Sequence, residues 1–134
     1  MLEYSNTFSF LAPSECKQYK FLNDSDRHSD FGRGDRKSDK NLTEDWYRFS
    51  AGAGMSIPTH CLPHHRCGTD MLGWMDGAHP TVDKGVVSRK VCFHGYYCNC
   101  CHRHIMINVR NCSSFFVYRL KPVQDCASRY CGKS

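Results

Sequence analysis

The stretch Cys98-Asn99-Cys100-Cys101 (CNCC, residues 98–101) places three cysteines in four positions. The whole chain has ten cysteines in 134 residues. This density is typical of extracellular domains built on disulfides, and the even number allows every cysteine to pair. Neighbouring residues of an extended chain point to opposite faces, so Cys100 and Cys101 are expected to bond to two different segments. The predicted disulfide cysteines are Cys16, Cys61, Cys67, Cys92, Cys98, Cys100, Cys101, Cys112, Cys126 and Cys131.

The cysteines also indicate the compartment. A chain of this length forms one domain with a limited core, and each disulfide adds roughly 2–4 kcal/mol by restricting the unfolded chain. Such bridges persist in an oxidising environment, so we expect a secreted, extracellular protein. The first ten residues do not resemble a secretion signal, which predicts a mature fragment. No apolar stretch approaches the roughly 20 residues of a membrane helix, so we expect no membrane span.

The net charge of +5 is mild, and basic residues are mixed with acidic ones. Nucleic-acid binding favours a concentrated basic patch with aromatic residues between the charges. No such patch is visible in the sequence, so nucleic acid is not an expected partner.

The chain divides into a lead-in at 1–15, one cysteine-rich domain at 16–131 and a tail at 132–134. Within the domain, residues 23–45 are almost entirely charged and small. A stretch of this kind buries too little apolar surface to offset its ordering entropy, which predicts a long, exposed and partly mobile loop.

Apolar residues alternate with polar ones in the second half of the chain, as Ile105, Ile107 and Val109 show. This two-residue period predicts strands, and no segment has a sustained helical period. The expected fold is small, disulfide-rich and mainly β, with an irregular α+β arrangement as the alternative. The antiparallel strands are expected near 45–50, 85–93, 104–112 and 114–120, with long loops between them.

Seven motifs occur in a fixed order. They are WYRF (46–49), CLPHHRCGT (61–69), W-x-D-G-x-H-P (74–80), GVVSRKVC (85–92), CC (100–101), FFVYRL (115–120) and C-x4-C (126–131). This series resembles the cysteine-rich module of uromodulin and the pancreatic secretory granule glycoprotein family, a module with eight to ten cysteines, over roughly residues 16–131. The resemblance implies a shared fold, whereas function resides in surface features that differ between members.

The resemblance also implies a disulfide pattern. It suggests the pairs Cys16–Cys112, Cys61–Cys100, Cys67–Cys131 and Cys92–Cys101, with Cys98 left to partner Cys126. The family usually has a cysteine shortly before WYRF, and residues 38–41 contain none; Cys98 is extra. A re-routed bridge would explain both departures, although sequence alone does not settle connectivity.

A second departure concerns glycans. In the mammalian relatives, the loop before the His-Pro pair carries a glycosylation sequon whose glycan captures bacterial adhesins. Residues 76–78 are Asp-Gly-Ala here, so that role does not transfer. Asn41 and Asn23 instead begin sequons in predicted surface loops. Asn111 begins a third, which is expected to be hindered by the neighbouring Cys112.

Arg33-Gly34-Asp35 is the sharpest candidate binding motif. Integrins bind this tripeptide because an extended loop presents a guanidinium and a carboxylate at opposite ends, and the carboxylate completes a receptor metal site. The location in the polar 23–45 loop favours this hypothesis. The alternative is a solvated charged loop without a receptor.

Metal binding and catalysis have weaker support. The spacings of Cys61 with Cys67 and of Cys98 with Cys100 fit structural zinc poorly, and His102 with His104 is only a weak surface candidate. No nucleophile elbow, HExxH motif or carboxylate pair is present, so we expect no enzyme and no cofactor. Tyr96 and Tyr97 are expected to pack around the disulfides, with some exposure beside Gly95.

The sequence therefore predicts a non-enzymatic extracellular binding or adhesion module, directed to an integrin through Arg33, Gly34 and Asp35. The expected partner is a cell-surface receptor or matrix protein. One alternative is a structural module for matrix or glycoprotein assembly, without recognition of the tripeptide. The other is a zinc-binding protein of a reducing compartment.

Overall fold

Seven strands and four 3-10 helices make up the protein in its computed structural model, which describes residues 12–96 and 98–134. The strands are β1 (Lys20–Leu22), β2 (Asp45–Phe49), β3 (Met71–Asp76), β4 (Val86–Phe93), β5 (Arg103–Asn111), β6 (Phe116–Leu120) and β7 (Ser128–Tyr130). The helices are η1 (Ser14–Cys16), η2 (Ser25–Arg27), η3 (Ala51–Ala53) and η4 (Val82–Lys84).

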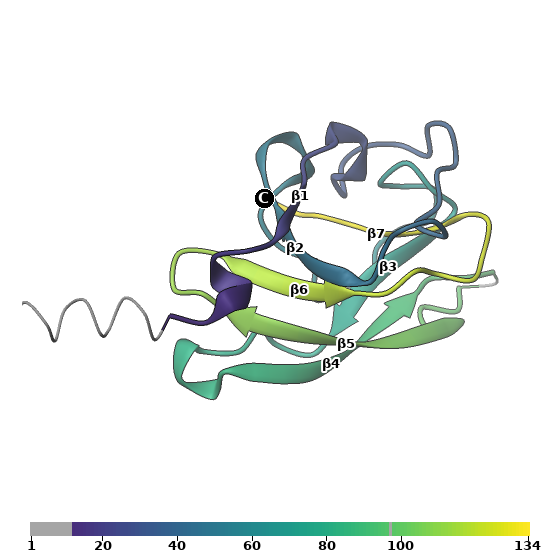
Figure 1. Cartoon of the computed structure of the whole chain (residues 1–134). Helices are drawn as coiled ribbons and strands as arrows, with labels where there is room; N and C mark the ends of the chain where they lie inside the picture. The colour runs from purple at the N-terminus through teal and green to yellow at the C-terminus, as the bar shows by residue number, and fades with distance from the viewer. Residues whose placement is uncertain (1–11, 97) are drawn as a thin grey trace, which may run out of the picture.

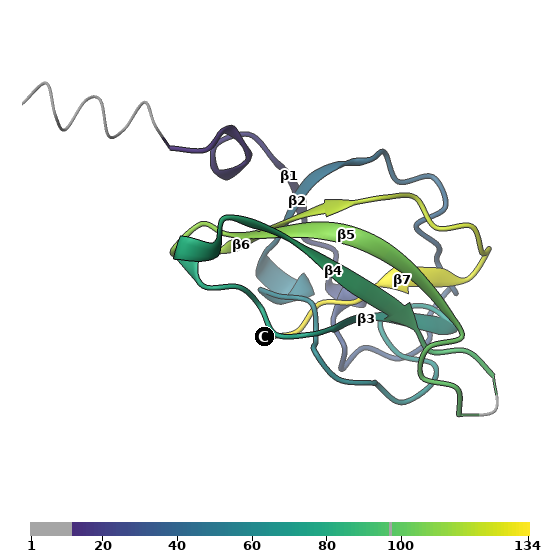
Figure 2. The same ribbon diagram turned by 90° about the horizontal axis from the view of Figure 1, so that it is seen from below.

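The strands form one sheet in the order β1-β2-β6-β5-β4-β3-β7. The central strands from β2 to β3 pair antiparallel, whereas the short edge strands β1 and β7 pair parallel to β2 and β3. Figures 1 and 2 show that the sheet is curved rather than flat. Because of this curvature, every strand contributes at least one side chain to a single core.

The alternation in β5 determines which side chains enter that core. Ile107 and Val109 are buried, whereas Met106 and Asn108, which alternate with them, are exposed. The two aromatic rings of Phe93 and Tyr130 meet edge to face in the core at a centroid distance of 5.7 Å. A curved sheet around an aromatic interior therefore supplies the scaffold.

The mainly β, disulfide-rich prediction is confirmed, and β2, β4, β5 and β6 occupy the four expected regions. Three strands were not expected. β1 and β7 have three residues each, too few for a period to show. β3 contains Gly73, whose missing side chain makes room for Phe93 and the β7 backbone, and glycine in a sequence favours a loop assignment.

Segment 23–45 is largely exposed, but a few of its residues are buried against the sheet. Many of its residues are exposed, but Arg27 and Asp39 are only 4% and 5% exposed. Both terminal nitrogens of Arg27 donate to the Asp39 carboxylate, at 2.7 and 2.9 Å. The Tyr130 backbone N–H also donates to Asp39 at 2.8 Å. A buried pair of charged residues thus ties this segment to β7, although its composition alone predicted that it would be exposed to solvent.

Four disulfides join Cys16 to Cys112, Cys61 to Cys100, Cys67 to Cys131 and Cys92 to Cys101, the four pairs that the resemblance implied. Cys100 and Cys101 bond to different segments, as their adjacency predicts. Two bridges connect the segment before β3 to the β4–β5 loop and to the chain end after β7. The third joins β4 to the β4–β5 loop, and the fourth joins η1 to the chain just after β5.

The remaining prediction, a bond between Cys98 and Cys126, is wrong for this structure, in which both cysteines are unbonded and exposed. They lie on the β4–β5 and β6–β7 loops, respectively. The Ser38 hydroxyl, in the stretch where the family usually has a cysteine, donates to the Asp125 carbonyl at 2.7 Å, next to Cys126. Cys126 therefore lies beside the stretch that lacks the family cysteine, whereas Cys98 was gained elsewhere.

The C-terminal end of the chain is bonded into the fold. Most of the expected lead-in lies outside the described residues. The expected tail is integrated: Gly132 N–H donates to the Arg27 carbonyl at 2.9 Å, and Lys133 N–H donates to the Ser56 carbonyl at 2.7 Å. Within the described ranges, no helix is long and apolar enough to cross a bilayer.

A half-buried histidine makes stability depend on pH. The ring of His79 lies 2.7 Å from the Tyr118 hydroxyl and packs on Phe116. Burial, together with the charge of Arg89, lowers the pKa of His79 from 6.5 to about 4. At pH values between about 4 and 6.5, the unfolded chain therefore binds more protons than the folded protein. The free energy of unfolding consequently falls as the pH drops from 6.5 to about 4.

Because the ring is partly exposed, we expect the free energy of unfolding to fall by about 2 kcal/mol between pH 7 and pH 4 on account of His79. Urea denaturation at several pH values measures this loss. His79→Phe is expected to flatten the dependence, and an unchanged slope in that variant would assign it to other groups.

Candidate functional site

The Arg-Gly-Asp tripeptide forms a tight turn, not the extended loop that the sequence predicted. Arg36 N–H donates to the Arg33 carbonyl at 3.3 Å, and Gly34 has a φ of +56°. This backbone angle is unfavourable for residues with a side chain. A Cβ on Gly34 would also lie 3.0 Å from the Phe31 ring, so both the backbone angle and the available space favour glycine here.

The turn is anchored to a disulfide-bonded segment. Cys67 N–H donates to the Phe31 carbonyl, Gly68 N–H to the Gly32 carbonyl and Lys37 N–H to the Gly68 carbonyl, all within 2.7–2.8 Å. Cys67 is completely buried and bonded to Cys131, next to β7. The position of the tripeptide is therefore fixed by the core.

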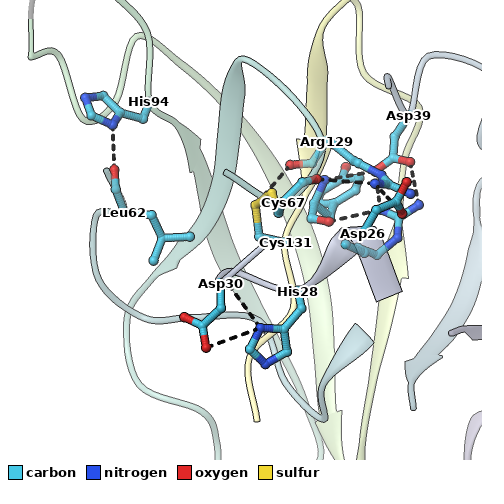
Figure 3. The surroundings of a disulfide bond; sticks show 11 residues. Asp26, His28, Asp30, Asp39, Leu62, Cys67, His94, Arg129 and Cys131 are labelled. Carbon is cyan, nitrogen blue, oxygen red and sulfur yellow. Dashed lines mark hydrogen bonds and ion pairs between the residues drawn. A yellow bond between two sulfur atoms is a disulfide. The ribbon is translucent and has the colours of Figure 1, made fainter. Parts of the chain in front are cut away.

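Figure 3 shows the surroundings of the Cys67–Cys131 disulfide. Arg129 Nη1 donates to Asp26 Oδ1 at 2.9 Å, and Lys37 Nζ lies 2.6 Å from the other carboxylate oxygen of Asp26. Burial raises the pKa of Asp26, but the hydrogen bonds from Lys37 and Arg129 outweigh it and hold the pKa below 3.8. This carboxylate stays ionised and holds the base of the turn to β7.

The side chains of the tripeptide differ in their surroundings. Asp35 is exposed, and Arg33 is 47% exposed with its Nε 3.1 Å from Asp70. Asp70 is only 15% exposed and is also held by Arg36, through two nitrogens at 2.6 Å, and by His65 at 3.2 Å. Arg33 is therefore one of three partners of a single carboxylate.

A cleft of about 420 Å³ lies beside the turn. It draws on three segments that are distant in sequence: the turn, the residues before β3 and the β4–β5 loop. No sequence pattern links these segments, which is why the cleft was not predicted. The residues that matter for its chemistry are Arg33, Arg36, His64, His65, Asp70 and Tyr96.

Tyr96, which was expected to pack around the disulfides, lines this cleft. Tyr96 is 64% exposed, so it is far more open to solvent than a residue that packs around a bridge. Tyr97 lies outside the described residues. Tyr96 is therefore available to a ligand.

Comparison with known proteins matches residues 47–132 to the family model of the uromodulin-like domain. The chain belongs to the uromodulin-like domain family. The pancreatic secretory granule membrane major glycoprotein GP2 of Canis lupus familiaris is 37% identical over 117 residues, which is 87% of this chain and 23% of that protein. Its Homo sapiens counterpart is 33% identical, over 87% of this chain and 21% of that protein. Uromodulin of Rattus norvegicus is 34% identical, over 87% of this chain and 18% of that protein.

This uromodulin-like domain spans about a fifth of the length of these relatives. Membership confirms the resemblance seen in the sequence motifs. The relatives include a named glycoprotein, and the four disulfides of the domain are typical of an extracellular environment.

The predicted sequons of the uromodulin-like domain differ in accessibility. Asn41 and Asn23 are both exposed. The Asn111 side chain donates to the Pro80 carbonyl at 3.1 Å and accepts a hydrogen bond from the Ser113 N–H at 2.8 Å. Its amide nitrogen, which a glycan would modify, is therefore engaged within the fold.

The zinc hypothesis requires thiolates, and eight of the ten cysteine sulfurs of the domain form disulfides here. Cys61, Cys100 and a ring nitrogen of His94 approach within 4.8 Å, but both sulfurs belong to one bridge. The weak candidates His102 and His104 are exposed, and they join no cluster of three ligands within the described residues.

Proposed function

We propose that this uromodulin-like domain is a secreted, non-enzymatic adhesion module that binds an integrin-type receptor through Arg33, Gly34 and Asp35. The observation that supports it is a tight turn with an exposed carboxylate at Asp35, whose flanking residues 31, 32 and 37 are hydrogen-bonded through the backbone to residues 67–68. A fixed turn loses less entropy on binding than a mobile loop does. The carboxylate would complete the metal site of the receptor.

Arg33 must be free to reach such a receptor, although it lies against Asp70. Exposed ion pairs contribute only about 0.2–1 kcal/mol, so leaving Asp70 costs Arg33 little. Asp70 would keep two partners, Arg36 and His65, and would not be left as an unpaired carboxylate. The arrangement therefore permits Arg33 to turn outward without disturbing the turn.

Asp35→Glu is expected to reduce integrin-dependent cell attachment by at least about tenfold, because the longer side chain displaces a charge-assisted contact of roughly 1.5–3 kcal/mol. Adhesion of cells to immobilised domain, with and without chelation of divalent cations, measures the effect. Asp30→Glu is the matched control, since its carboxylate is 88% exposed in the same segment. Equal attachment to the wild type and the Asp35 variant would eliminate this function.

A second candidate is assembly with a neighbouring protein domain, and an aromatic cluster at the β1 edge favours it. The Arg48 guanidinium lies 3.9 Å from the centre of the Phe115 ring and donates to the Tyr19 hydroxyl at 2.9 Å. Phe21 beside them is 55% exposed. Aromatic residues and arginine are enriched at protein interfaces. Loss of attachment with Asp35→Glu separates the first candidate from this one.

Glycosylation accompanies both candidates. We propose N-linked glycans at Asn41 and Asn23, whose side chains are exposed on segment 23–45. A glycan at Asn41 lies on the same segment as the tripeptide and would limit access to it.

A further inference from the structure

The cleft beside the turn carries more positive than negative charge. Asp70 is the only carboxylate among its described lining residues, and it faces two guanidinium groups, from Arg33 and Arg36. Burial, followed by the nearby His94 and His65, lowers the pKa of His64, so that ring contributes no charge at neutral pH. Net positive charge therefore resides on the arginines.

Both guanidinium groups remain accessible to a ligand. The side chains of Arg33 and Arg36 are 47% and 53% exposed, even though each contacts Asp70. Arginine binds carboxylate and sulfate groups in a planar, two-point geometry. An anion that enters the cleft can therefore take the free edges of both groups while Asp70 holds them in place.

The cleft also has an aromatic wall. Tyr96, at the start of the β4–β5 loop, is 64% exposed and meets the His102 ring edge to face at a centroid distance of 6.1 Å. An exposed tyrosine presents an apolar face with a polar tip. The apolar face of a sugar ring stacks on such a ring, whereas an acidic peptide gains little from it. A volume of about 420 Å³ accommodates one or two sugar units.

We propose that this cleft binds an acidic glycan, with its carboxylate or sulfate on Arg36 and Arg33 and its sugar ring against Tyr96. Sialylated and sulfated glycans share this chemistry. The proposal adds an activity to the adhesion function and does not involve Asp35, so Asp35→Glu is expected to bind the glycan as the wild type does. Failure of one proposal therefore leaves the other intact.

The test measures binding of the folded chain to four immobilised probes: heparin, a sialylated oligosaccharide, its desialylated counterpart and polyglutamate. We expect binding to heparin or to the sialylated sugar, and which of the two binds identifies the acidic group. Binding should weaken with added salt, since the contacts are between exposed charges. The neutral sugar is expected not to bind.

Arg36→Gln is expected to weaken that binding by at least about tenfold, and Tyr96→Ala by severalfold. Lys84→Gln is the matched control: it removes the same charge from η4, at the far end of β4 from the cleft (Figure 1).

Three results would overturn the proposal. The first is no binding to either acidic glycan. The second is an equal loss from Arg36→Gln and Lys84→Gln, which would indicate attraction by net charge alone. The third is equally tight binding of polyglutamate with no effect of Tyr96→Ala, which would assign the cleft to an acidic protein segment.

Discussion

Asp39→Ala is expected to lower the free energy of unfolding by about 3–5 kcal/mol, because it leaves the buried charge of Arg27 without its partner. Arg27 would keep only the Tyr130 carbonyl, at 2.9 Å. The Tyr130 N–H would lose its acceptor as well. An unpaired buried charge costs far more than the pair contributes, so the loss is expected to exceed that of an ordinary surface variant.

Urea denaturation of Asp39→Ala and Asp30→Ala measures this difference. Asp30 is in the same segment, but its carboxylate is 88% exposed, so its variant is expected to change stability by no more than about 0.5 kcal/mol. Equal stability of the two variants would contradict this prediction. It would mean that the Arg27 guanidinium becomes solvated at little cost when Asp39 is removed.

The double variant Cys67→Ala/Cys131→Ala is expected to lower the free energy of unfolding by about 4 kcal/mol, because this bridge links residues that are 64 positions apart and so closes a long loop. Both residues are completely buried, so cavity formation adds to this loss. The bridge also supports residues 67–68, to which the Arg-Gly-Asp turn is bonded. Cell attachment is therefore expected to fall together with stability.

The comparison variant is Cys92→Ala/Cys101→Ala. Its bridge links residues only 9 positions apart, so its removal is expected to lower the free energy of unfolding by about 3 kcal/mol. Thermal and chemical denaturation of both double variants, with cell attachment measured at a temperature where both are folded, tests the ranking. Normal attachment to folded Cys67→Ala/Cys131→Ala would show that the turn keeps its shape without the bridge.

Sequence patterns predicted the parts of the fold that depend on repetition. The alternation at Ile105, Ile107 and Val109 indicated β5, because one face of a strand is buried and the other is not. β1 and β7 were not predicted because three residues cannot establish a period. Gly73 concealed β3, since close packing against Phe93 and β7 needs a residue that otherwise indicates a loop.

The candidate site depends on contacts that sequence does not encode locally. Arg27 and Asp39 resemble solvated charges in the sequence, and only the tertiary fold brings them together in a dry environment. The tripeptide was visible as a string, but its tight turn is positioned by hydrogen bonds between its flanking residues and residues 67–68. The cleft combines Arg36, Asp70 and Tyr96 from three segments, so no spacing rule could assemble it.

The unbonded Cys98 has a consequence for how the protein acquires its bridges. Three sulfurs of one loop compete for Cys61 and Cys92 while the chain oxidises. The β4–β5 hairpin pairs Cys92 with His104, three residues from Cys101, so this short-range bond forms readily once the hairpin exists. Cys98 and Cys100 then compete for Cys61. A non-native Cys61–Cys98 bond would be open to attack by the Cys100 thiolate, which would release Cys98 and form the native bond, so we expect Cys98 to slow oxidative folding without preventing it.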